Sequence, residues 1–214
     1  MVQEREIKLR IHDVDTFRRK LEGLGAQLLA GNPGPVHELN LIFDTPQSDL
    51  AKRGQLLRIR TETAGPGPSQ GGRASRRIVL TFKRPVAGQK EPAAEHHKVR
   101  EELELEVSDA AMLGRIFEGL GMHGWFRYEK YRSTFQLPDS VTWAKGLLIE
   151  LDETPIGTFV ELEGPAEAID RAAEALGFSP REYIVMNYLS LYFEDCRAKG
   201  IEPRDMVFQV EKNK

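Results

Sequence analysis

Charged residues recur at every second position along several segments of this sequence. Glu4, Glu6 and Lys8 alternate with the apolar Ile7 and Leu9. In an extended strand the side chains at i and i+2 point to the same face, so the segment presents one charged and one apolar face. Carboxylates bind hard cations such as Mg²⁺, and lysine and arginine bind phosphate oxygens. Such a mixture favours binding of a polyanion together with a metal ion.

The same alternation appears in six further segments. The candidate bases are Lys8, Arg58, Arg60, Lys83, Arg100, Lys130 and Arg132, and the candidate acids are Glu4, Glu6, Glu102, Glu104, Glu150, Asp152, Glu161 and Glu163. Seven bases against eight acids leave the set nearly neutral, so a bound polyanion would need added positive charge. Mg²⁺ or Mn²⁺ would supply this charge, because these cations bridge carboxylate and phosphate oxygens.

Strand and helix patterns must position these residues. Period-two alternation predicts strands over 2–11, 37–45, 54–62, 76–85, 99–107, 125–137, 141–153 and 157–164. Four helices are also predicted. The first runs from Asp13 to Gly25, with Val14, Phe17, Leu21 and Leu24 on one face, and the second begins at Ser108 or Asp109, with Met112, Ile116 and Leu120 as its apolar face. The third runs from Pro165 to Gly177 and the fourth covers 188–199. The order is one strand, a helix, four strands, a helix, three strands and two helices.

The charged strand faces have two interpretations. For any single strand, a solvated charged face over an apolar core is the more common arrangement. Helices with apolar faces could instead cover the apolar side of the sheet from outside, and closing the sheet into a barrel would turn the charged faces inward. A charged interior is costly unless something fills it, so such a barrel should hold water, metal and an ionic ligand.

The tetrapeptide EGLG occurs at 22–25 and again at 118–121. Each copy ends a predicted helix that follows one strand and precedes another. This repetition indicates an internal duplication, with about four strands in each half.

Bulk composition narrows the class of protein. The chain has 214 residues, 40% hydrophobic and 29% charged, with a net charge of −3, so it has no basic excess for nucleic acid. The single cysteine, Cys196, excludes an intramolecular disulfide, and neither a signal peptide nor a membrane-spanning run is evident. We therefore expect one domain over 1–200, with a loop insertion at 64–76 and a tail at 201–214. We expect it in the cytoplasm, as a monomer or homodimer, without nucleic acid or membrane partners.

The ordered motifs resemble the CYTH family, also called triphosphate tunnel metalloenzymes. EREIK fits the ExExK signature of that family, and IFDTP, LRIR, LTFKRP, REELE, YEKYR and LDETPIGTFVELEG follow in the family's order, over residues 2–193. The resemblance implies an α+β fold, an eight-stranded antiparallel closed β-barrel with helices packed outside. It implies metal-dependent hydrolysis of a triphosphate, such as inorganic tripolyphosphate, thiamine triphosphate or a nucleoside triphosphate. Other members are class IV adenylyl cyclases, which make cyclic AMP and pyrophosphate from ATP.

The resemblance also implies roles for individual residues. Metal would be held by Glu4, Glu6, Asp152, Glu161 and Glu163, and phosphates by Lys8, Arg58, Arg60, Lys83, Arg100, Lys130 and Arg132. Glu102 and Glu150 would support the site by pairing with neighbouring arginines, whereas Glu104 and Glu106 would lie beyond the tunnel. Lys83 or a metal-binding carboxylate such as Glu4 or Glu6 would orient or deprotonate the attacking water, and the sequence does not choose between them.

Several other residues of reactive or aromatic type have simpler predicted roles. His96 and His97 follow a loose loop and are predicted to be exposed, and Cys196, Trp125 and Trp143 are predicted to pack rather than to react or to stack a base. Asn187, Tyr188 and Ser190 are candidates to plug one end of the tunnel. A non-catalytic polyphosphate-binding module remains an alternative function, but the acidic pairs disfavour it, since pure binding needs bases more than metal ligands.

Overall fold

The computed structural model describes residues 2–29, 34–65, 75–86 and 97–209. Eight antiparallel strands form a closed barrel, as predicted, in the order β7-β3-β4-β5-β6-β1-β9-β8, and pairing of β8 with β7 closes it. A short ninth strand, β2, pairs with β7. The strands are β1 (Val2–Ile11), β2 (Gln27–Leu28), β3 (Val36–Asp44), β4 (Leu56–Ala64), β5 (Ser75–Arg84), β6 (Lys98–Glu106), β7 (His123–Gln136), β8 (Leu148–Thr154) and β9 (Gly157–Glu163).

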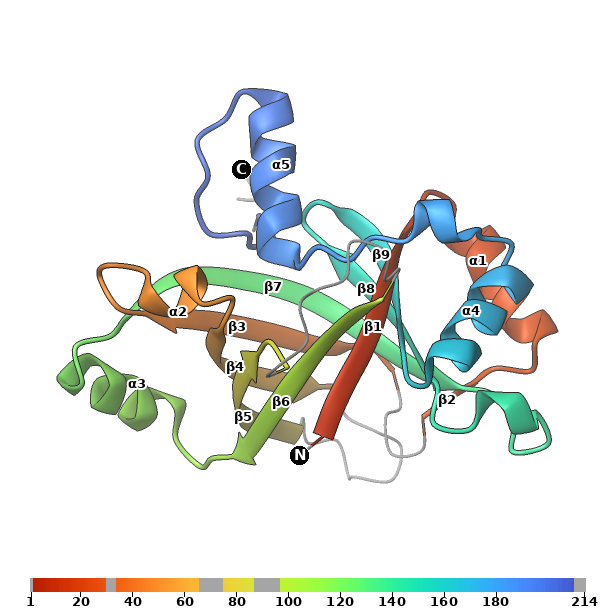
Figure 1. The fold of residues 1–214 in the computed structure, drawn as a ribbon, viewed down its shortest axis with the longest axis horizontal. Coiled ribbons are helices and arrows are strands. Elements are labelled where there is room, and N and C mark those ends of the chain that lie inside the picture. The colour runs from red at the N-terminus through yellow and green to blue at the C-terminus, as the bar shows by residue number, and fades with distance from the viewer. Residues whose placement is uncertain (1, 30–33, 66–74, 87–96, 210–214) are drawn as a thin grey trace.

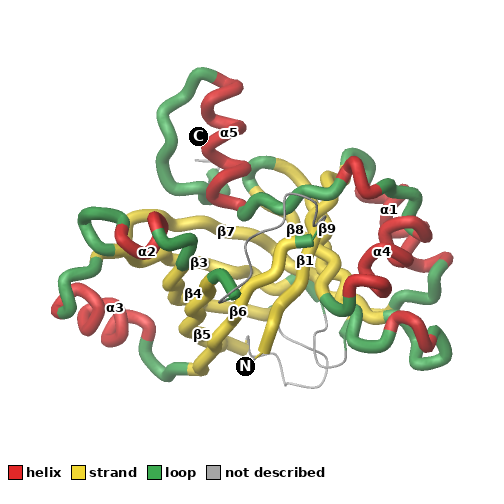
Figure 2. The backbone as a smooth tube through the Cα atoms, in the orientation of Figure 1, coloured by secondary structure: helices red, strands yellow, loops and turns green. Residues whose placement is uncertain are grey.

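Five α-helices of the described residues lie outside the barrel (Figures 1 and 2). They are α1 (Val14–Gly23), α2 (Asp49–Lys52), α3 (Ala110–Gly119), α4 (Ala166–Ala175) and α5 (Tyr188–Lys199). The short α2 lies within the predicted turn between β3 and β4. In the described part of the chain, no helix is long and apolar enough to span a membrane.

One predicted strand is wrong over half of its length. Residues 141–153 were expected to be extended, but Thr142–Ala144 form a 3₁₀ turn and β8 begins only at Leu148. Gly146 explains the break, because its φ of +79° is a left-handed conformation that interrupts a strand. Most of the predicted loop 64–76, and most of the loop that precedes β6, lie outside the described residues.

Helices α1 and α4 together cover the outer face of β1, β8 and β9. Ile7 and Leu9 of β1 are fully buried there against Ile169 of α4 and against Leu176, the residue that follows α4. Asp13 begins α1, since its side chain accepts a hydrogen bond from the Thr16 amide at 2.9 Å. The apolar side of this part of the barrel is therefore sealed from water, as the barrel hypothesis requires.

Helix α3 covers the outer face of β3, β4 and β5, but with a different face from the one predicted. Leu113 and Phe117 pack against the sheet. Met112, Ile116 and Leu120, which were expected to be buried, are 52%, 51% and 70% exposed. The helix has apolar residues on two adjoining faces, so the periodicity alone could not decide which of them meets the sheet.

Residues after α5 also join the fold. The backbone of Met206 bonds to β7, from its amide to the Arg127 carbonyl and from the Glu129 amide to its own carbonyl, each at 2.9 Å. The Met206 side chain is 1% exposed and belongs to the cluster under α5. The sequence of this segment carried no signal for such a contact.

Candidate active site

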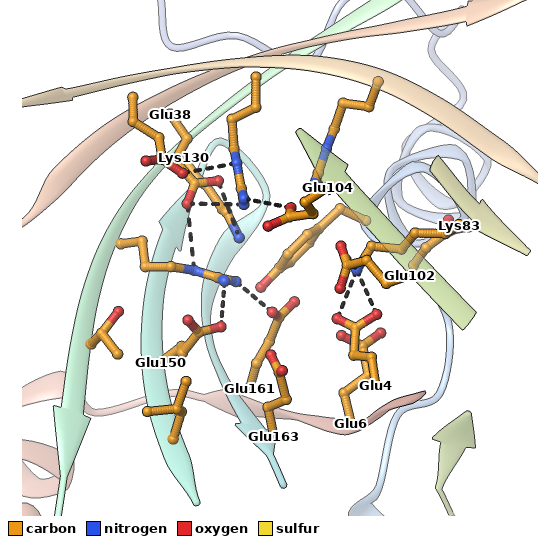
Figure 3. A pocket seen from close by; sticks show the side chains of 18 of the residues that line it. Glu4, Glu6, Glu38, Lys83, Glu102, Glu104, Lys130, Glu150, Glu161 and Glu163 are labelled. Carbon is orange, nitrogen blue, oxygen red and sulfur yellow. Dashed lines mark hydrogen bonds and ion pairs between the residues drawn. The ribbon is translucent and has the colours of Figure 1, made fainter. Parts of the chain in front are cut away.

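The charged faces of the strands line a cavity of about 410 Å³ inside the barrel (Figure 3). Period-two alternation explains this, because the apolar residues that alternate with the charged ones lie on the outer face of the strands. Charged side chains from seven strands and one from β3 line it: Glu4, Glu6, Lys8, Glu38, Arg58, Arg60, Glu62, Arg77, Lys83, Lys98, Glu102, Glu104, Lys130, Arg132, Glu150, Glu161 and Glu163.

Strands β7, β3 and β4 form an arc of the wall that is rich in cations. Four bases line it, Arg58, Arg60, Lys130 and Arg132, against the two carboxylates Glu38 and Glu62. We call this wall the cationic arc.

Arg58 is held rigidly within the cationic arc. It donates hydrogen bonds to the Tyr128 hydroxyl at 2.9 Å and to the Thr81 hydroxyl at 3.2 Å, and it is 7% exposed. Such fixing prepares a guanidinium for an anion because little freedom is lost on binding.

Glu38 lies between three of the bases and was missed by the sequence analysis. Its carboxylate is 3.5 Å from Lys130, 3.6 Å from Arg60 and 3.8 Å from Arg132. Burial opposes its ionisation, but Lys130, Arg60 and Arg132 outweigh burial and lower the pKa of Glu38 to about 2. Glu38 has no charged residue two positions away in the strand 37–45 and so gave no paired signal, although Glu38 and Asn40 do alternate with apolar neighbours.

Strands β1, β9 and β8 form the opposite wall, which we call the carboxylate arc. Five carboxylates line it, against one lysine, Lys8: Glu4, Glu6, Glu150, Glu161 and Glu163. Lys8 lies 3.0 Å from Glu6 and 3.1 Å from Glu161. Arg132 reaches across from β7 and forms ion pairs with Glu150 and Glu161.

Strands β5 and β6 join the two arcs with a mixed set of charges. Lys83 contacts Glu4 at 2.6 Å and Glu102 at 3.1 Å, and Figure 3 shows both carboxylates pointing toward it. Lys98, which the sequence analysis missed, lies 2.6 Å from Glu6. Burial disfavours the charged form of Lys83, but Glu4 and Glu6 outweigh burial and raise the pKa of Lys83. Lys83 is therefore better suited to donate to an oxygen anion than to accept a proton.

Three predicted residues occupy places that differ from those expected. Glu104 was expected beyond the tunnel, yet it lines the cavity and accepts hydrogen bonds from Thr81 at 2.9 Å and Arg60 at 3.2 Å. Asp152 is fully buried behind the wall. Arg100 faces Glu4 in the β1–β6 register and is not one of the described residues that line the cavity. Glu106 behaves as predicted, since it pairs with Arg77 at 3.0 Å on a wet strand end.

Asp152 anchors the bases of the cavity from behind. It accepts hydrogen bonds from Lys130 at 2.9 Å, from Arg132 at 2.7 Å and from the Tyr188 hydroxyl at 2.7 Å. With three donors already bound, its carboxylate orients Lys130 and Arg132 in this structure. Its predicted role as a metal ligand stays a prediction.

The family model for the CYTH domain matches residues 2–177. This chain belongs to the CYTH domain family. Solved structures share its fold at low identity. A putative adenylate cyclase from Vibrio parahaemolyticus aligns with a TM-score of 0.66 and 18% identity, over 88% of this chain and 96% of the other. A Pyrococcus horikoshii protein aligns with a TM-score of 0.67 and 22% identity, over 90% and 99%.

A putative adenylate cyclase from Bacillus halodurans aligns with a TM-score of 0.56 and 17% identity, over 90% of this chain and 100% of the other. No curated protein matches the chain. At these identities the solved structures show the shared fold, so the chemistry of this CYTH domain must be argued from its own cavity.

The carboxylate arc of this CYTH domain holds more negative charge than its own bases balance. Burial raises the pKa of Glu150 to about 7 against the attraction of Arg132, and repulsion from Glu161 adds to the rise. Burial, together with Glu150 and Glu4, raises the pKa of Glu163 to about 8. Crowded carboxylate oxygens of this kind are the donor set that Mg²⁺ and Mn²⁺ prefer.

The carboxylate oxygens of these residues are therefore the right kind of ligand for a divalent cation, but the side chains do not converge on one point in this structure. Within the ranges that the structure describes, no three Asp, Glu, His or Cys side chains converge closely enough to hold a metal ion. Glu4 and Glu161 are occupied by lysine and arginine contacts. Holding a metal would require these side chains to exchange their base partners for the cation.

One end of the barrel interior is apolar and closed by the C-terminal helix. Ile42, Phe126 and Phe159 share strand faces with the charged lining residues, and they pack against Tyr188 and Leu191 of α5. Asn187 caps α5 by accepting from the Ser190 amide at 2.8 Å, and Asn187 and Tyr188 line the cavity. Helix α5 lies beyond the segment that the family model matches.

Other residues singled out in the sequence lie away from the cavity. Cys196 is fully buried, as predicted, and Trp143 packs at the edge of the α1–α4 core. Trp125 is 37% exposed on the outside of β7. His97 is not an exposed loop residue, because its side chain is only 10% exposed and lies 2.8 Å from Asp170 of α4. His96 falls outside the described residues.

Proposed function

We propose that this chain hydrolyses a triphosphate inside the barrel with the help of a divalent cation. The observation that carries the proposal is the division of one cavity into a cationic arc and a carboxylate arc. The first suits a phosphate chain and the second suits the metal that such a chain brings with it. Members of the CYTH family that are triphosphate tunnel enzymes support the same assignment.

The cationic arc would bind the phosphate chain. Arg58 and Arg132 present planar guanidinium groups that can make paired hydrogen bonds to phosphate oxygens, and Lys130 adds a point charge. Glu38 now neutralises Lys130, Arg60 and Arg132 at distances of 3.5 to 3.8 Å. These ion pairs are longer than direct hydrogen bonds, so a phosphate oxygen that makes direct hydrogen bonds would compete with Glu38 for these bases.

The carboxylate arc would hold the cation through Glu4, Glu161 and Glu163, with Glu6 and Glu150 beside them. The cation, when bound, would withdraw charge from phosphoryl oxygens and so make phosphorus easier to attack. Lys83 lies beside Glu4 and keeps its proton, so it would donate to an oxygen of the leaving phosphate. A carboxylate of this arc would orient the attacking water and take its proton.

Cyclisation of ATP is the second candidate, favoured by the names of two structures that share the fold. In that reaction the ribose 3′-hydroxyl attacks the α-phosphorus and pyrophosphate leaves. It requires a place for adenine beside the charged residues. Among the described residues, the cavity offers three aliphatic lining side chains, Val36, Leu56 and Leu148. Its two lining tyrosines, Tyr128 and Tyr188, are already hydrogen-bonded to Arg58 and Asp152. Hydrolysis needs no such pocket and is therefore the better-supported reaction.

A product assay tests the proposal. The purified full chain with Mg²⁺ or Mn²⁺ is offered tripolyphosphate, thiamine triphosphate and ATP, and the products are separated. We expect orthophosphate release that depends on the metal. Cyclic AMP and pyrophosphate from ATP would instead establish the cyclase. Tight binding of tripolyphosphate without turnover of any substrate would overturn both and leave a binding module.

A further inference from the structure

The two halves of the barrel begin with equivalent units. The segment from β1 through α1 matches the segment from β6 through α3 at a constant offset of 96 positions, as between Glu22 and Glu118 of the two EGLG sequences. Asp13 and Asp109 cap the two helices in the same way, each accepting from an amide at 2.9 Å. In the β1–β6 register, Glu4 faces Arg100, which is also 96 positions away. A local two-fold axis therefore passes between these strands.

The equivalent residues of the two units have opposite exposure. Ile7 and Leu9 of β1 are fully buried, whereas their equivalents on β6, Leu103 and Leu105, are 48% and 61% exposed. The difference arises from α4, whose apolar face belongs to the same core as Ile7 and Leu9. In the described part of the chain, no helix covers Leu103 and Leu105 in the same way.

The flank of α3 beside this bare strand is also apolar. Met112, Ile116 and Leu120 lie at i, i+4 and i+8, so they form one stripe along the helix. Their equivalents on α1 include Lys20, which donates to the Leu176 carbonyl at the end of α4 at 2.6 Å. The stripe on α3 therefore lies on the side of its helix that corresponds to the side of α1 facing α4. Together with Leu103 and Leu105 it forms a surface that we call the α3–β6 face.

We propose that the α3–β6 face is the interface of a homodimer, in which α3 of a second copy takes the place that α4 takes beside α1. Helix α3 is suited to be the occupant because its stripe is apolar and exposed. In a two-fold arrangement with antiparallel helices, the stripes pack on each other. Each α3 then also lies over Leu103 and Leu105 of the partner. One two-fold contact therefore covers the exposed apolar side chains of both copies and leaves no further surface open for a third.

The size of the face agrees with this assignment. Its five large apolar side chains are each about half exposed or more, between 48% and 70%. They offer on the order of several hundred Å² per copy, the size at which an apolar patch marks an interaction site. Two copies would bury roughly 1,000 Å², the lower limit for a specific interface. Leaving this surface in water would forgo that hydrophobic gain.

The mass of the full chain in solution tests the proposal. Sedimentation should give twice the chain mass of 24.2 kDa, and Ile116→Glu or Leu105→Glu should return it to 24.2 kDa. Both positions are exposed in one copy, so unchanged circular dichroism and melting of the variants would show that folding is intact. Ile201→Glu is the matched control, because Ile201 is 53% exposed but lies outside the face. It should leave the mass doubled.

A cross-linking experiment tests the geometry. Cys196 is the only cysteine and is fully buried, so Ile116→Cys adds one accessible thiol close to the proposed two-fold axis. A short bismaleimide should link two copies of this variant and should not link Ile201→Cys. A mass of 24.2 kDa at all concentrations up to about 100 µM would overturn the proposal, because it would leave less than about 5.5 kcal/mol of association free energy. So would a dimer that survives both glutamate substitutions. Turnover is not measured, so the outcome is independent of the proposed reaction.

Discussion

The two arcs of the cavity solve the problem of buried charge in different ways. The cationic arc has four lining bases and two carboxylates, and the structure fixes Arg58 through Tyr128 and Thr81 and fixes Lys130 through Asp152. The carboxylate arc has five lining carboxylates and one lysine, and two of its carboxyls, Glu150 and Glu163, have raised pKa values. One arc is therefore already stabilised by the protein, whereas the other is incomplete without added positive charge. The comparison predicts a metal on one side and a phosphate chain on the other.

Removal of divalent cations should have the largest effect on activity. Without them the carboxylate arc would repel a triphosphate, and no other group in that arc replaces the missing charge. Turnover of tripolyphosphate should be abolished in excess chelator and restored by adding Mg²⁺ or Mn²⁺. Full activity in excess chelator would show that the carboxylate arc serves another purpose.

Substitution within the carboxylate arc should come next. Glu161→Gln keeps the shape of the side chain but removes its charge, and we expect at least about a 100-fold loss of kcat, in line with the cost of disturbing metal partners. Glu153→Gln is the matched control on the neighbouring strand, because Glu153 points outward and its side chain is 49% exposed. An unchanged rate for Glu161→Gln at saturating metal would exclude Glu161 as a ligand.

Substitution within the cationic arc should have a comparable or smaller effect. Arg58→Ala and Arg60→Ala each remove a charge-assisted hydrogen bond worth about 1.5–3 kcal/mol, which corresponds to roughly a 10–150-fold loss of kcat/KM. Arg18→Ala on the outer surface of α1 is the control and should stay within about twofold. If all three variants behave alike and only their salt dependence changes, the arginines do not touch substrate.

Much of this contrast could be read from period-two alternation, because the pattern assigns each residue to a face. Lys8, Arg58, Lys130 and Glu161 were placed in the barrel for that reason. Alternation does not tell which residues of the inner face reach the cavity and which are covered by neighbouring elements. Asp152 shares the inner face of its strand with Glu150, yet it lies behind the wall because α5 and the neighbouring strand cover it.

The helices show the same limit. The ends of α5 agree with the predicted range 188–199, and its Asn187 cap is a local signal. The buried face of α3 was wrong, because the choice between Phe117 and Ile116 depends on what packs beside the helix. The burial of Met206 likewise depends on an open edge of β7, which no local pattern near residue 206 could indicate.

The smallest expected effect concerns stability, and it tests whether the two arcs act together. A ligand that binds only the folded state stabilises it by RT ln(1 + [L]/Kd), about 2.7 kcal/mol at a hundredfold excess over Kd. For a domain of this size that corresponds to roughly 5–10 °C in Tm. Tripolyphosphate alone must face the repulsion of the carboxylate arc, and metal alone must face the bases that now pair with its ligands.

Each ligand should therefore lower the cost of binding the other, and the rise in Tm with both should exceed the sum of the separate rises. A melting series with neither, either and both measures this directly. The Glu161→Gln variant should keep the shift from tripolyphosphate and lose the excess, because it removes only the carboxylate side of the coupling. Arg58→Ala should lose the phosphate shift and keep the response to metal. Purely additive shifts in the unsubstituted protein would mean that the two arcs bind independently, and the interleaved site would then be wrong even if the protein is an enzyme.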